Sequence, residues 1–423
     1  MFALSLPSIT YRLYSAIILS AGVLLASAVD AADAAEPSTS NDIKGSLVII
    51  GGALHTDNDE VWKRIVRQAG GEGAKIAVIP AASANPERSG NATAATLNRF
   101  GAKAFVLPLS VNYQDQPYQE IARDPHWLAQ LQQASGVYFT GGDQARITQA
   151  LVQPDGKKTP MLEAIWALYR TGGVIAGSSA GAAIMSSTMF YDAKPNLATL
   201  KQGVSYGKEI APGLGFIGNE VFVDQHLIVR GRFARMIPAM LKANYRLGLG
   251  IDENTAMVIS HQNEVEIIGY KGAILVDLSS ATSDHNNPDF NVANVRLSYL
   301  DRGDHFNLSS KVMTPSADKI KNKLNPATPY RDESLFYPDI LANTAVVDLM
   351  HALIDNRQTS ATGLAFGNAN NKDVQPDLGF EFSFHKTAES AGYYSGNLGY
   401  ESYSVLNILL DIKPVKMALP LYR

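Results

Sequence analysis

The sequence predicts an α/β fold in which helices cover both faces of a parallel sheet, a three-layer sandwich. Three observations support this prediction: continuous apolar runs of three or four residues, a glycine or proline within two residues after each run, and helix-period segments between the runs. Strands that are buried on both faces need such runs, and parallel strands need a long crossover between them. Ligands of these sheets bind beyond the carboxyl ends of the strands, so the active site is expected there.

The expected strands follow one another in the first half of the chain. They cover 47–50, 76–79, 104–107, 137–139 and 174–176, and the residues that end them are Gly51, Pro80, Pro108, Gly141 and Gly177. The segments between them have helical periodicity, because Val61, Ile65 and Ala69 share one helix face, and Leu128, Leu131 and Ala134 share another.

The pattern changes after about Gly250. Short apolar runs at 257–259, 265–268 and 273–276 predict a meander at one edge of the sheet. A helix is expected over 340–354, and alternating apolar residues predict two late strands around 380–384 and 406–412. The polar, proline-bearing stretch from about 309 to 338 places a domain boundary there. We therefore expect an α/β catalytic domain at 45–308 and a mixed extension of strands plus one helix at 309–423.

The N-terminus reads as a signal peptide over 1–31, followed by a linker over 32–44. Arg12 precedes the apolar run Ala16 to Leu25, and small residues that a signal peptidase could cleave come after it. Ten apolar residues are too few to span a bilayer, which needs about 20. We expect export, either to the periplasm or out of the cell, with no stable membrane insertion after cleavage. An uncleaved membrane anchor is the alternative.

The composition excludes several classes of protein. Hydrophobic residues make up 46% and charged residues 18%, which is ordinary for a globular enzyme. The net charge of −4 provides no overall field that would attract nucleic acid. The absence of cysteine excludes disulfides, thiolate metal sites and a cysteine nucleophile. The histidines show no metal-ligand spacing, so neither a metal nor a cofactor is expected.

The strongest local motif is Gly177-Ser178-Ser179-Ala180-Gly181-Ala182, directly after the fifth apolar run. A serine on a tight strand-to-helix turn projects its hydroxyl over the edge of the sheet, and small neighbours are needed because the backbone is crowded there. Ser179 is therefore the predicted nucleophile, and Ser178 is a second choice. A helix start with a capping serine would give a similar pattern.

A serine nucleophile needs a base, and His226 is the best candidate. It follows Asp224 and Gln225 at the end of an apolar run and is followed by three arginines, Arg230, Arg232 and Arg235. A solvated strand end that leads into a basic amphipathic helix would also produce this density of polar groups.

The segment Phe139-Thr140-Gly141-Gly142-Asp143-Gln144 supplies a third element of the predicted site. Successive glycines after a strand leave backbone N–H groups exposed, as an oxyanion hole requires. Gln144, at the next helix start, could contact substrate. The segment lacks the spacing of a dinucleotide fingerprint or a phosphate loop.

Taken together and in order, these motifs and Gly250-Ile251-Asp252-Glu253-Asn254-Thr255-Ala256 resemble those of cyanophycinases. These are serine hydrolases of the dipeptidase E group, and their fold is similar to that of class I glutamine amidotransferases. The resemblance spans about residues 45–308. The signal peptide and the added C-terminal region resemble the exported, extracellular members of the family.

The resemblance implies an activity. Cyanophycin has a poly-aspartate backbone with an arginine linked to each β-carboxylate, and cyanophycinases release β-aspartyl-arginine dipeptides from it. By resemblance, Ser179 attacks the backbone carbonyl and His226 transfers the proton, while the amides of Gly142 and Ala180 are candidates for the oxyanion hole.

The resemblance also implies roles for the polar residues around the site. The arginines Arg230, Arg232 and Arg235 would hold carboxylates of the substrate, since guanidinium groups pair with them bidentately. Asp224, Gln225 and Gln144 would face arginine or backbone groups of the polymer. Some of the arginines could instead only brace the pocket.

The acid of the triad is the least defined residue. In dipeptidase E an aspartate lies roughly fifteen residues beyond the serine, and Asp192 is the only acid between Tyr191 and Gln202. Asp192 is therefore nominated, and Glu209, Asp224 and Asp252 stay open.

Three other functions are weighed against this one. A dipeptidase E-like enzyme that cleaves aspartyl or isoaspartyl dipeptides would share the serine and histidine but would not need three arginines. An α/β-hydrolase esterase fits Gly177-x-Ser179-x-Gly181, but that fold places its histidine late in the chain. A non-catalytic binding protein could keep the fold without turnover. The oligomeric state is not specified, and a homodimer stays open.

Overall fold

The computed structural model describes residues 43–367, 375–397, 401–416 and 418. The predicted signal peptide lies outside these residues, as does the predicted linker except for Ile43 and Lys44. All described residues fall in one compact unit, Ser40–Arg423. None of the described helices is long and apolar enough to cross a membrane.

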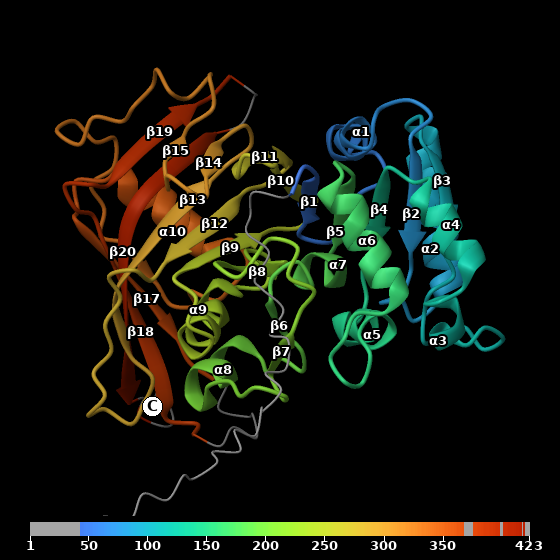
Figure 1. The fold of residues 1–423 in the computed structure, drawn as a ribbon. Helices are drawn as coiled ribbons and strands as arrows, with labels where there is room; N and C mark the ends of the chain where they lie inside the picture. Colours follow the sequence, from blue (N-terminus) through green and yellow to red (C-terminus); the bar gives the residue numbers. More distant parts are fainter. Residues whose placement is uncertain (1–42, 368–374, 398–400, 417, 419–423) are drawn as a thin grey trace, which may run out of the picture. The chain divides into compact units, whose positions relative to one another are not determined.

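A mixed first sheet carries the parallel strands that the sequence predicts (Figure 1). Within the described residues its order is β15-β14-β11-β10-β1-β5-β4-β2-β3, and the strands from β1 to β3 in this order are parallel. The parallel strands are β1 (Ser46–Ile50), β2 (Lys75–Ile79), β3 (Lys103–Val106), β4 (Gly136–Phe139) and β5 (Val174–Ser178). Antiparallel pairs add β10 (Thr255–Ile259), β11 (Glu264–Gly269), β14 (His305–Asn307) and β15 (Met313–Thr314).

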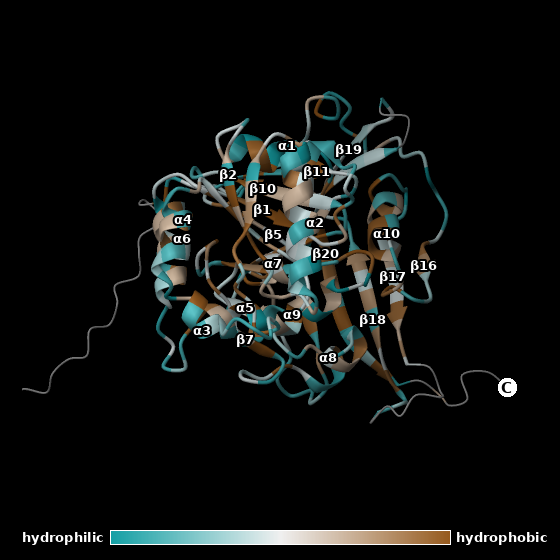
Figure 2. Cartoon of the chain, turned by 90° about the vertical axis from the view of Figure 1, so that its right-hand side faces the viewer, coloured by the Kyte–Doolittle hydropathy of each residue, from teal (hydrophilic) through white to brown (hydrophobic). Residues whose placement is uncertain are grey.

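Helices cover both faces of this sheet, which confirms the predicted fold class. In β1, Val48 and Ile50 pack with α1 (Asp59–Gln68) and α2 (Pro86–Arg99), whereas Leu47 and Ile49 belong to the core on the other face. That second core includes residues of α4 (Pro125–Gln132), α5 (Gln144–Leu151), α6 (Pro160–Arg170) and α7 (Ala180–Ala183), and α3 (Tyr118–Ile121) lies before them. Figure 2 shows hydrophilic stretches along α1 and α2, as expected of helices with one buried face.

The helices begin where the sequence offers side-chain caps. The side chains of Asn58, Asn85, Asp124, Asp143 and Thr159 accept hydrogen bonds from backbone amides at the starts of α1, α2, α4, α5 and α6. Such caps satisfy amides that have no partner inside the helix. The loops before them therefore end at defined residues, which fixes the turns at the carboxyl edge of the sheet.

A second sheet contains most of the strands after β5. Its order in the described residues is β16-β17-β18-β20-β13-β12-β9-β8, with β19 paired to β20. The strands are β8 (Val221–Gln225), β9 (Leu247–Ile251), β12 (Ala273–Asp277), β13 (Val292–Leu300), β16 (Phe336–Tyr337), β17 (Ser360–Ala365), β18 (Leu378–His385), β19 (Ala391–Ser395) and β20 (Ser402–Lys416). A separate antiparallel pair of β6 (Thr188–Phe190) and β7 (Ile210–Pro212) flanks α8 (Asn196–Gln202). Residues of α8, α9 (Phe233–Lys242) and α10 (Ala345–Ile354) pack with the second sheet in one hydrophobic core.

The region after β9 differs from the expected meander. The predicted runs at 257–259 and 265–268 form β10 and β11 of the first sheet, whereas the run at 273–276 is β12 of the second sheet. The chain crosses between sheets at the turn that carries Tyr270 and Lys271.

The strand pairings also continue across the predicted boundary at residue 308. β13, which precedes it, pairs antiparallel with β20, which lies far beyond it. The two late strands and the helix expected in this region are present as β18, β20 and α10, although α10 begins at Ala345. Residues 309–423 therefore contribute strands to a sheet that the earlier segment begins.

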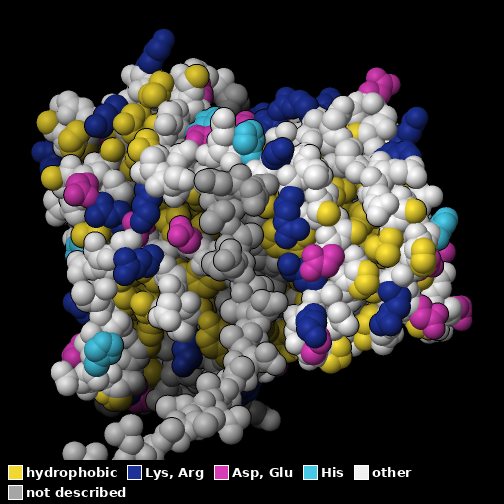
Figure 3. All heavy atoms as spheres, viewed as in Figure 1, with side chains coloured by type: hydrophobic (Ala, Val, Ile, Leu, Met, Phe, Trp, Pro, Cys, Tyr) yellow, Lys and Arg dark blue, Asp and Glu magenta, His cyan; other side chains and the backbone are white. Residues whose placement is uncertain are grey.

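Charges of both signs are mixed on the face shown in Figure 3, where basic and acidic side chains alternate with apolar ones. This distribution agrees with the small net charge of −4. The carboxyl ends of β1 and β5 meet the end of β8 from the second sheet through backbone hydrogen bonds, and the predicted site lies at this junction.

Candidate active site

Ser179 lies on a strained turn between β5 and α7. Its φ of 56° and ψ of −107° are unusual for a residue with a side chain. The turn is crowded, because a Cβ at Gly177 would lie 2.2 Å from the carbonyl oxygen of Gly181, and a Cβ at Gly181 would lie 2.5 Å from that of Phe139. The small residues of the motif are therefore required by packing. Ser178 is buried at the end of β5, so it is not the exposed hydroxyl of this turn.

His226 follows β8 and faces Ser179. The Oγ of Ser179 lies 2.8 Å from the Nε2 of His226. His226 also has a positive φ, 49°, and its amide donates to the carbonyl of Gly51, while the amide of Ser179 donates to the carbonyl of Ile50. The end of β1 thus holds both residues. A Cβ at Gly52 would lie 2.2 Å from the His226 ring, so only glycine fits beside the imidazole.

The carboxylate beside His226 belongs to Glu253, which corrects the nomination of Asp192. The Oε1 of Glu253 lies 2.5 Å from the Nδ1 of His226. With Nδ1–H donating to this carboxylate, Nε2 of the neutral ring accepts the hydroxyl hydrogen of Ser179. Asp192 is exposed after β6, where its amide donates to the carbonyl of Lys208, and the described hydrogen bonds and ion pairs include none between it and His226.

The other carboxylates that stayed open are engaged elsewhere. Glu209 pairs with Lys194 at 2.9 Å, and Asp224 forms two hydrogen bonds with Arg235. Asp252 is fully buried and accepts from the amides of Ile228 and Val229, in the turn that follows His226. Asp252 therefore holds the backbone beside the histidine, and its neighbour Glu253 reaches the imidazole.

Glu253 lies within the motif Gly250–Ala256, but it was not among the acids predicted from the sequence. The available signal was a pair of adjacent acids directly after the apolar run of β9, at the carboxyl edge where ligands bind. Because successive side chains near a strand end point to opposite sides, one acid of such a pair can be buried and the other can face the site.

The surroundings of His226 favour its neutral form. Burial lowers the pKa of the imidazole, the hydrogen bond with Glu253 opposes this effect, and the positive charges of Arg230 and Arg232 lower the pKa further. A neutral imidazole that is hydrogen-bonded to a hydroxyl can accept its proton, so the arrangement can activate Ser179 for nucleophilic attack.

The predicted oxyanion residues have open amides. In the described part of the chain, no hydrogen bond from the backbone amide of Gly142 or Ala180 is present. Gly142 has a φ of 142°, and a Cβ there would lie 2.1 Å from the carbonyl oxygen of Ala82. A Cβ at the preceding Gly141 would lie 3.2 Å from the Cβ of Ser179, which places this glycine turn against the serine.

The polar residues predicted to bind substrate fall into two groups: those whose hydrogen-bonding groups pair within the protein, and those that stay partly exposed. Asp224 and Arg235 are both buried and pair at 2.7 and 2.8 Å, and the guanidinium of Arg235 lies over the ring of Phe190. Their hydrogen-bonding groups face each other, so this pair braces the wall of the site. The Nε2 of Gln144 donates to the carbonyl of Phe190 and ties the same wall to α5.

Arg230 and Arg232 are more accessible. The side chain of Arg230 is 50% exposed, and its Nη2 lies 3.8 Å from the Oε1 of Glu253. Arg232 donates from Nη1 to both the carbonyl and the side-chain oxygen of Gln225. Burial and the nearby Arg235 lower the pKa of Arg232 to about 10, so it stays cationic near neutral pH. These two arginines are the site's available cations on this side.

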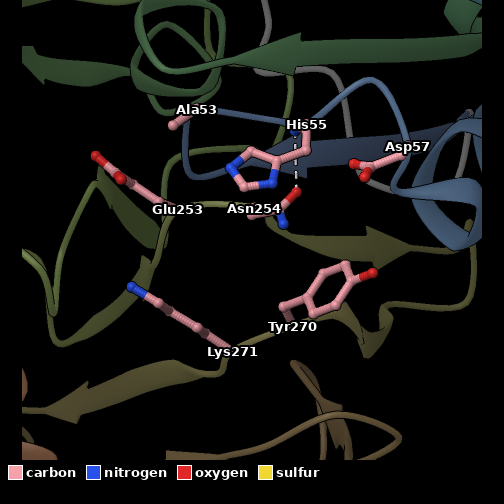
Figure 4. Close-up of a pocket in the computed structure, with 7 residues that line it drawn as sticks. All are labelled: Ala53, His55, Asp57, Glu253, Asn254, Tyr270 and Lys271. Carbon is pink, nitrogen blue, oxygen red and sulfur yellow. Dashed lines mark hydrogen bonds between the residues drawn. The ribbon is translucent and has the colours of Figure 1, made fainter.

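A pocket of about 440 Å³ lies on the side of Glu253 toward the loop after β1 (Figure 4). Its lining comes from three places: the loop after β1, the turn between β9 and β10, and the turn between β11 and β12. The polar lining residues are His55, Asp57, Glu253, Asn254, Tyr270 and Lys271. The amide of His55 donates to the side-chain oxygen of Asn254, which joins the loop after β1 to the turn between β9 and β10 on one side of the pocket.

Nothing in the described residues resembles a metal centre, since no group of three or more His, Asp or Glu side chains is placed to hold an ion. The described residues bring together a hydroxyl, an imidazole and a carboxylate in series.

Comparison with known proteins gives consistent matches. Residues 47–268 match the model described as Peptidase family S51. The chain is 31% identical over 294 residues to the cyanophycinase of Trichormus variabilis, which covers 68% of this chain and 93% of that protein. It is 33% identical over 280 residues to the cyanophycinase of Geminocystis herdmanii, covering 63% and 94%. Among solved structures, a peptidase from an acI-B1 Actinobacterium aligns with a TM-score of 0.44 at 22% identity, over 63% of this chain and 98% of that one.

Proposed function

The chain belongs to peptidase family S51, a family of serine-type peptidases, and from this premise we propose that it is an exported exopeptidase that hydrolyses cyanophycin to β-aspartyl-arginine dipeptides. The observation that carries the proposal is the continuous series Ser179 Oγ, His226 and Glu253, joined at 2.8 and 2.5 Å. The proposed substrate is that named for the relatives in Trichormus and Geminocystis.

In the proposed acylation step, Ser179 attacks the backbone carbonyl carbon of an aspartyl unit. His226 takes the hydroxyl proton at Nε2, and Glu253 stabilises the resulting imidazolium through Nδ1–H. The amides of Gly142 and Ala180 would donate to the oxyanion. Collapse of this intermediate breaks the peptide bond, and the leaving amine takes the proton from Nε2.

In the proposed deacylation step, water attacks the acyl-enzyme and His226 again accepts the proton. The serine leaves as the hydroxyl, and the acyl part leaves with a new carboxylate. Because the depressed pKa keeps His226 neutral near pH 7, the base is in its reactive form at the start of both steps.

The charged rim of the site is suited to this polymer. Each arginyl group that is linked through its α-amine keeps a free carboxylate, and Arg230 is accessible to pair with one. We assign Arg232 with Gln225 to the same surface, and we assign Asp224 with Arg235 to bracing it. Gln144 keeps its side-chain oxygen for a donor from the polymer.

The test is mass spectrometry of the soluble products after incubation with suspended cyanophycin. We expect wild type to release β-aspartyl-arginine, Ser179→Ala to release none above background, and the matched control Ser178→Ala to retain turnover. Release from short aspartyl or isoaspartyl dipeptides without release from the polymer would replace the proposal with a dipeptidase. Binding of the polymer without any hydrolysis would indicate a non-catalytic protein.

Export is tested separately, because the N-terminal segment lies outside the described residues. We expect the protein from its native cells to be recovered from the periplasm or the medium with its N-terminus beginning near residue 32. Recovery of the intact N-terminus in the membrane fraction would instead identify an uncleaved anchor.

A further inference from the structure

The pocket beside Glu253 has two chemically different ends. In Figure 4, Asp57 and the ring of Tyr270 lie on one side, and Glu253 and the amine of Lys271 lie on the other, with His55 between them. One end therefore offers a carboxylate with an aromatic face, and the other offers an ammonium group next to the carboxylate of Glu253. None of the roles assigned above uses Asp57, Tyr270 or Lys271.

The first end offers two exposed side chains, those of Asp57 and Tyr270, that can bind a cationic group. Tyr270 is 65% exposed, and Asp57 is exposed in the turn before α1. Within the described ranges, the Asp57 carboxylate has no ion pair and the Tyr270 ring has no aromatic or cationic partner. A planar guanidinium can pair with a carboxylate and stack on an aromatic ring at the same time.

The second end presents the ammonium group of Lys271, which is held by the buried carboxylate of Asp252. The Nζ of Lys271 lies 2.9 Å from the buried Oδ2 of Asp252, and the lysine side chain is 39% exposed. The other oxygen of Asp252 accepts from two amides, so the negative charge of this carboxylate is balanced by these amides and by the nearby ammonium group. An ammonium group has three donors, and those of Lys271 that do not face Asp252 can bind an anion in the pocket.

We propose that this pocket binds the arginyl group of a polymer unit next to the bond that is cleaved, with its guanidinium at Asp57 and Tyr270 and its free carboxylate at Lys271. The inference rests on the proposed function. A β-linked arginine has both of these charges, because its α-amine is consumed in the amide bond and its carboxylate and guanidinium stay free. Neither end of the pocket alone would select this group.

The pocket is placed to act on a neighbouring unit rather than on the reacting carbonyl. It shares Glu253 with the catalytic series, and the Oε1 of that residue lies 2.5 Å from His226. Only the side chain of Glu253 would therefore separate an arginyl group held there from the imidazole of His226. Its binding would fix the register of the polymer on Ser179 and would appear in KM more than in kcat.

The experiment compares three short synthetic oligomers of aspartate, each with the same number of units. The first has β-linked arginine, the second has β-linked citrulline, which is neutral and close in shape, and the third has arginine with its carboxylate converted to the carboxamide. We measure kcat and KM for wild type, Asp57→Asn and Tyr270→Ser. The matched controls are Asp155→Asn and Tyr330→Ser, which change exposed residues of the same types.

For the arginine oligomer, we expect Asp57→Asn to raise KM about 10-fold, as the loss of a charge-assisted hydrogen bond predicts, with kcat nearly unchanged. Tyr270→Ser should raise KM about 2- to 5-fold. For the citrulline oligomer, wild type and Asp57→Asn should have equal KM values. The carboxamide should raise the KM of wild type by about 10-fold, because it removes the anion that Lys271 binds.

The pocket assignment is overturned if wild type cleaves the arginine oligomer and both pocket variants match their controls in KM. It is also overturned if Asp57→Asn raises KM equally for arginine and citrulline. No cleavage of the arginine oligomer by wild type would instead overturn the proposed function, so the two failures are distinguishable.

Discussion

Two clusters of charged groups in this chain differ in how completely their members are paired. In the catalytic series, His226 and Glu253 lie on turns, the side chain of Glu253 is 26% exposed, and a positive φ occurs at both Ser179 and His226. In the second cluster, Lys319 is fully buried with its Nζ 2.9 Å from Asp304 and 3.9 Å from Asp301. Ser402 and Ser404 of β20 donate to these two carboxylates.

This difference distinguishes a candidate catalytic site from a cluster that stabilises the fold. The buried cluster joins the turn between β13 and β14 to β20 and leaves no group facing solvent, so its charges contribute to folding. The candidate catalytic series keeps strained backbone and a partly exposed hydroxyl, and the described hydrogen bonds include none from the amides of Gly142 and Ala180, so these groups stay available to a substrate. Substitutions in the first cluster should therefore change turnover, and those in the second should change stability.

The largest expected effect is at Glu253, the proposed acid of the triad. Glu253→Gln should lower kcat about 10⁴-fold, because the amide no longer favours the tautomer that accepts from Ser179 or stabilises the imidazolium. Asp192→Asn, the matched control, should leave kcat within about 2-fold of wild type. Steady-state kinetics on the arginine oligomer measure both. A large loss in Asp192→Asn with near-normal Glu253→Gln would reverse the assignment.

Substitution in the buried cluster around Lys319 should change the stability of the fold and not the turnover. Lys319→Met should lower the free energy of unfolding by about 3–5 kcal/mol, because it leaves Asp301 and Asp304 buried without a cation. Burial already raises the pKa of Asp304, and Lys319 opposes that rise. Urea unfolding measures the loss, and the folded fraction should keep the kcat of wild type. Lys63→Met at an exposed pair should cost no more than about 0.5 kcal/mol; an equal cost in the two variants would contradict the account.

A histidine near the buried cluster should make stability depend on pH. Burial lowers the pKa of His351 to about 3, and its ring contacts those of Tyr299 and Tyr403. Below the ordinary value of about 6.5 the unfolded chain binds a proton that the folded chain does not, so His351 lowers stability by up to about 1.4 kcal/mol per pH unit. His351→Phe should lose this part of the pH dependence. The measurement is the difference between unfolding free energies at pH 7 and pH 5, and an unchanged difference would refute the prediction.

The smallest expected effect is a shift of the pH profile caused by Arg230, the cation beside His226 and Glu253, separate from its proposed contact with the substrate. Arg230→Gln removes a positive charge that lowers the pKa of His226, so the imidazole should be protonated at higher pH. The acid limb of kcat/KM should therefore shift to higher pH, by less than about one unit. Arg123→Gln, an exposed arginine before α4, is the control and should leave the limb in place. A shift to lower pH would contradict the electrostatic argument.

Much of the fold could be predicted because the burial of a strand can be recognised from its own residues. The runs at 47–50, 76–79 and 174–176 are continuous and end at glycine or proline, so both their burial and their ends are visible. The assignment of β12 to the second sheet could not be predicted in this way. A short apolar run has the same pattern whichever sheet it joins, and only tertiary pairing with β9 and β13 decides it.

Part of the candidate site could likewise be proposed from the sequence. Ser179 and His226 stand in motifs whose residue types are required locally, by the tight turn and by the strand end. Glu253 lies 27 residues beyond His226, and its partner is determined by how β9 and β10 meet the end of β1. Likewise, nothing in the spacing of Asp224 and Arg235 showed that they would face each other and not the substrate.

The central claim is that Glu253 and His226 activate the hydroxyl of Ser179, and a serine-directed organophosphonate tests it without a substrate. Intact-protein mass spectrometry follows formation of the adduct, and peptide mapping locates it. The account predicts one adduct at Ser179 in wild type, an equal rate in Asp192→Asn, a much slower rate in Glu253→Gln, and none in Ser179→Ala. Labelling of Glu253→Gln at the wild-type rate, or an adduct that persists in Ser179→Ala, would contradict it.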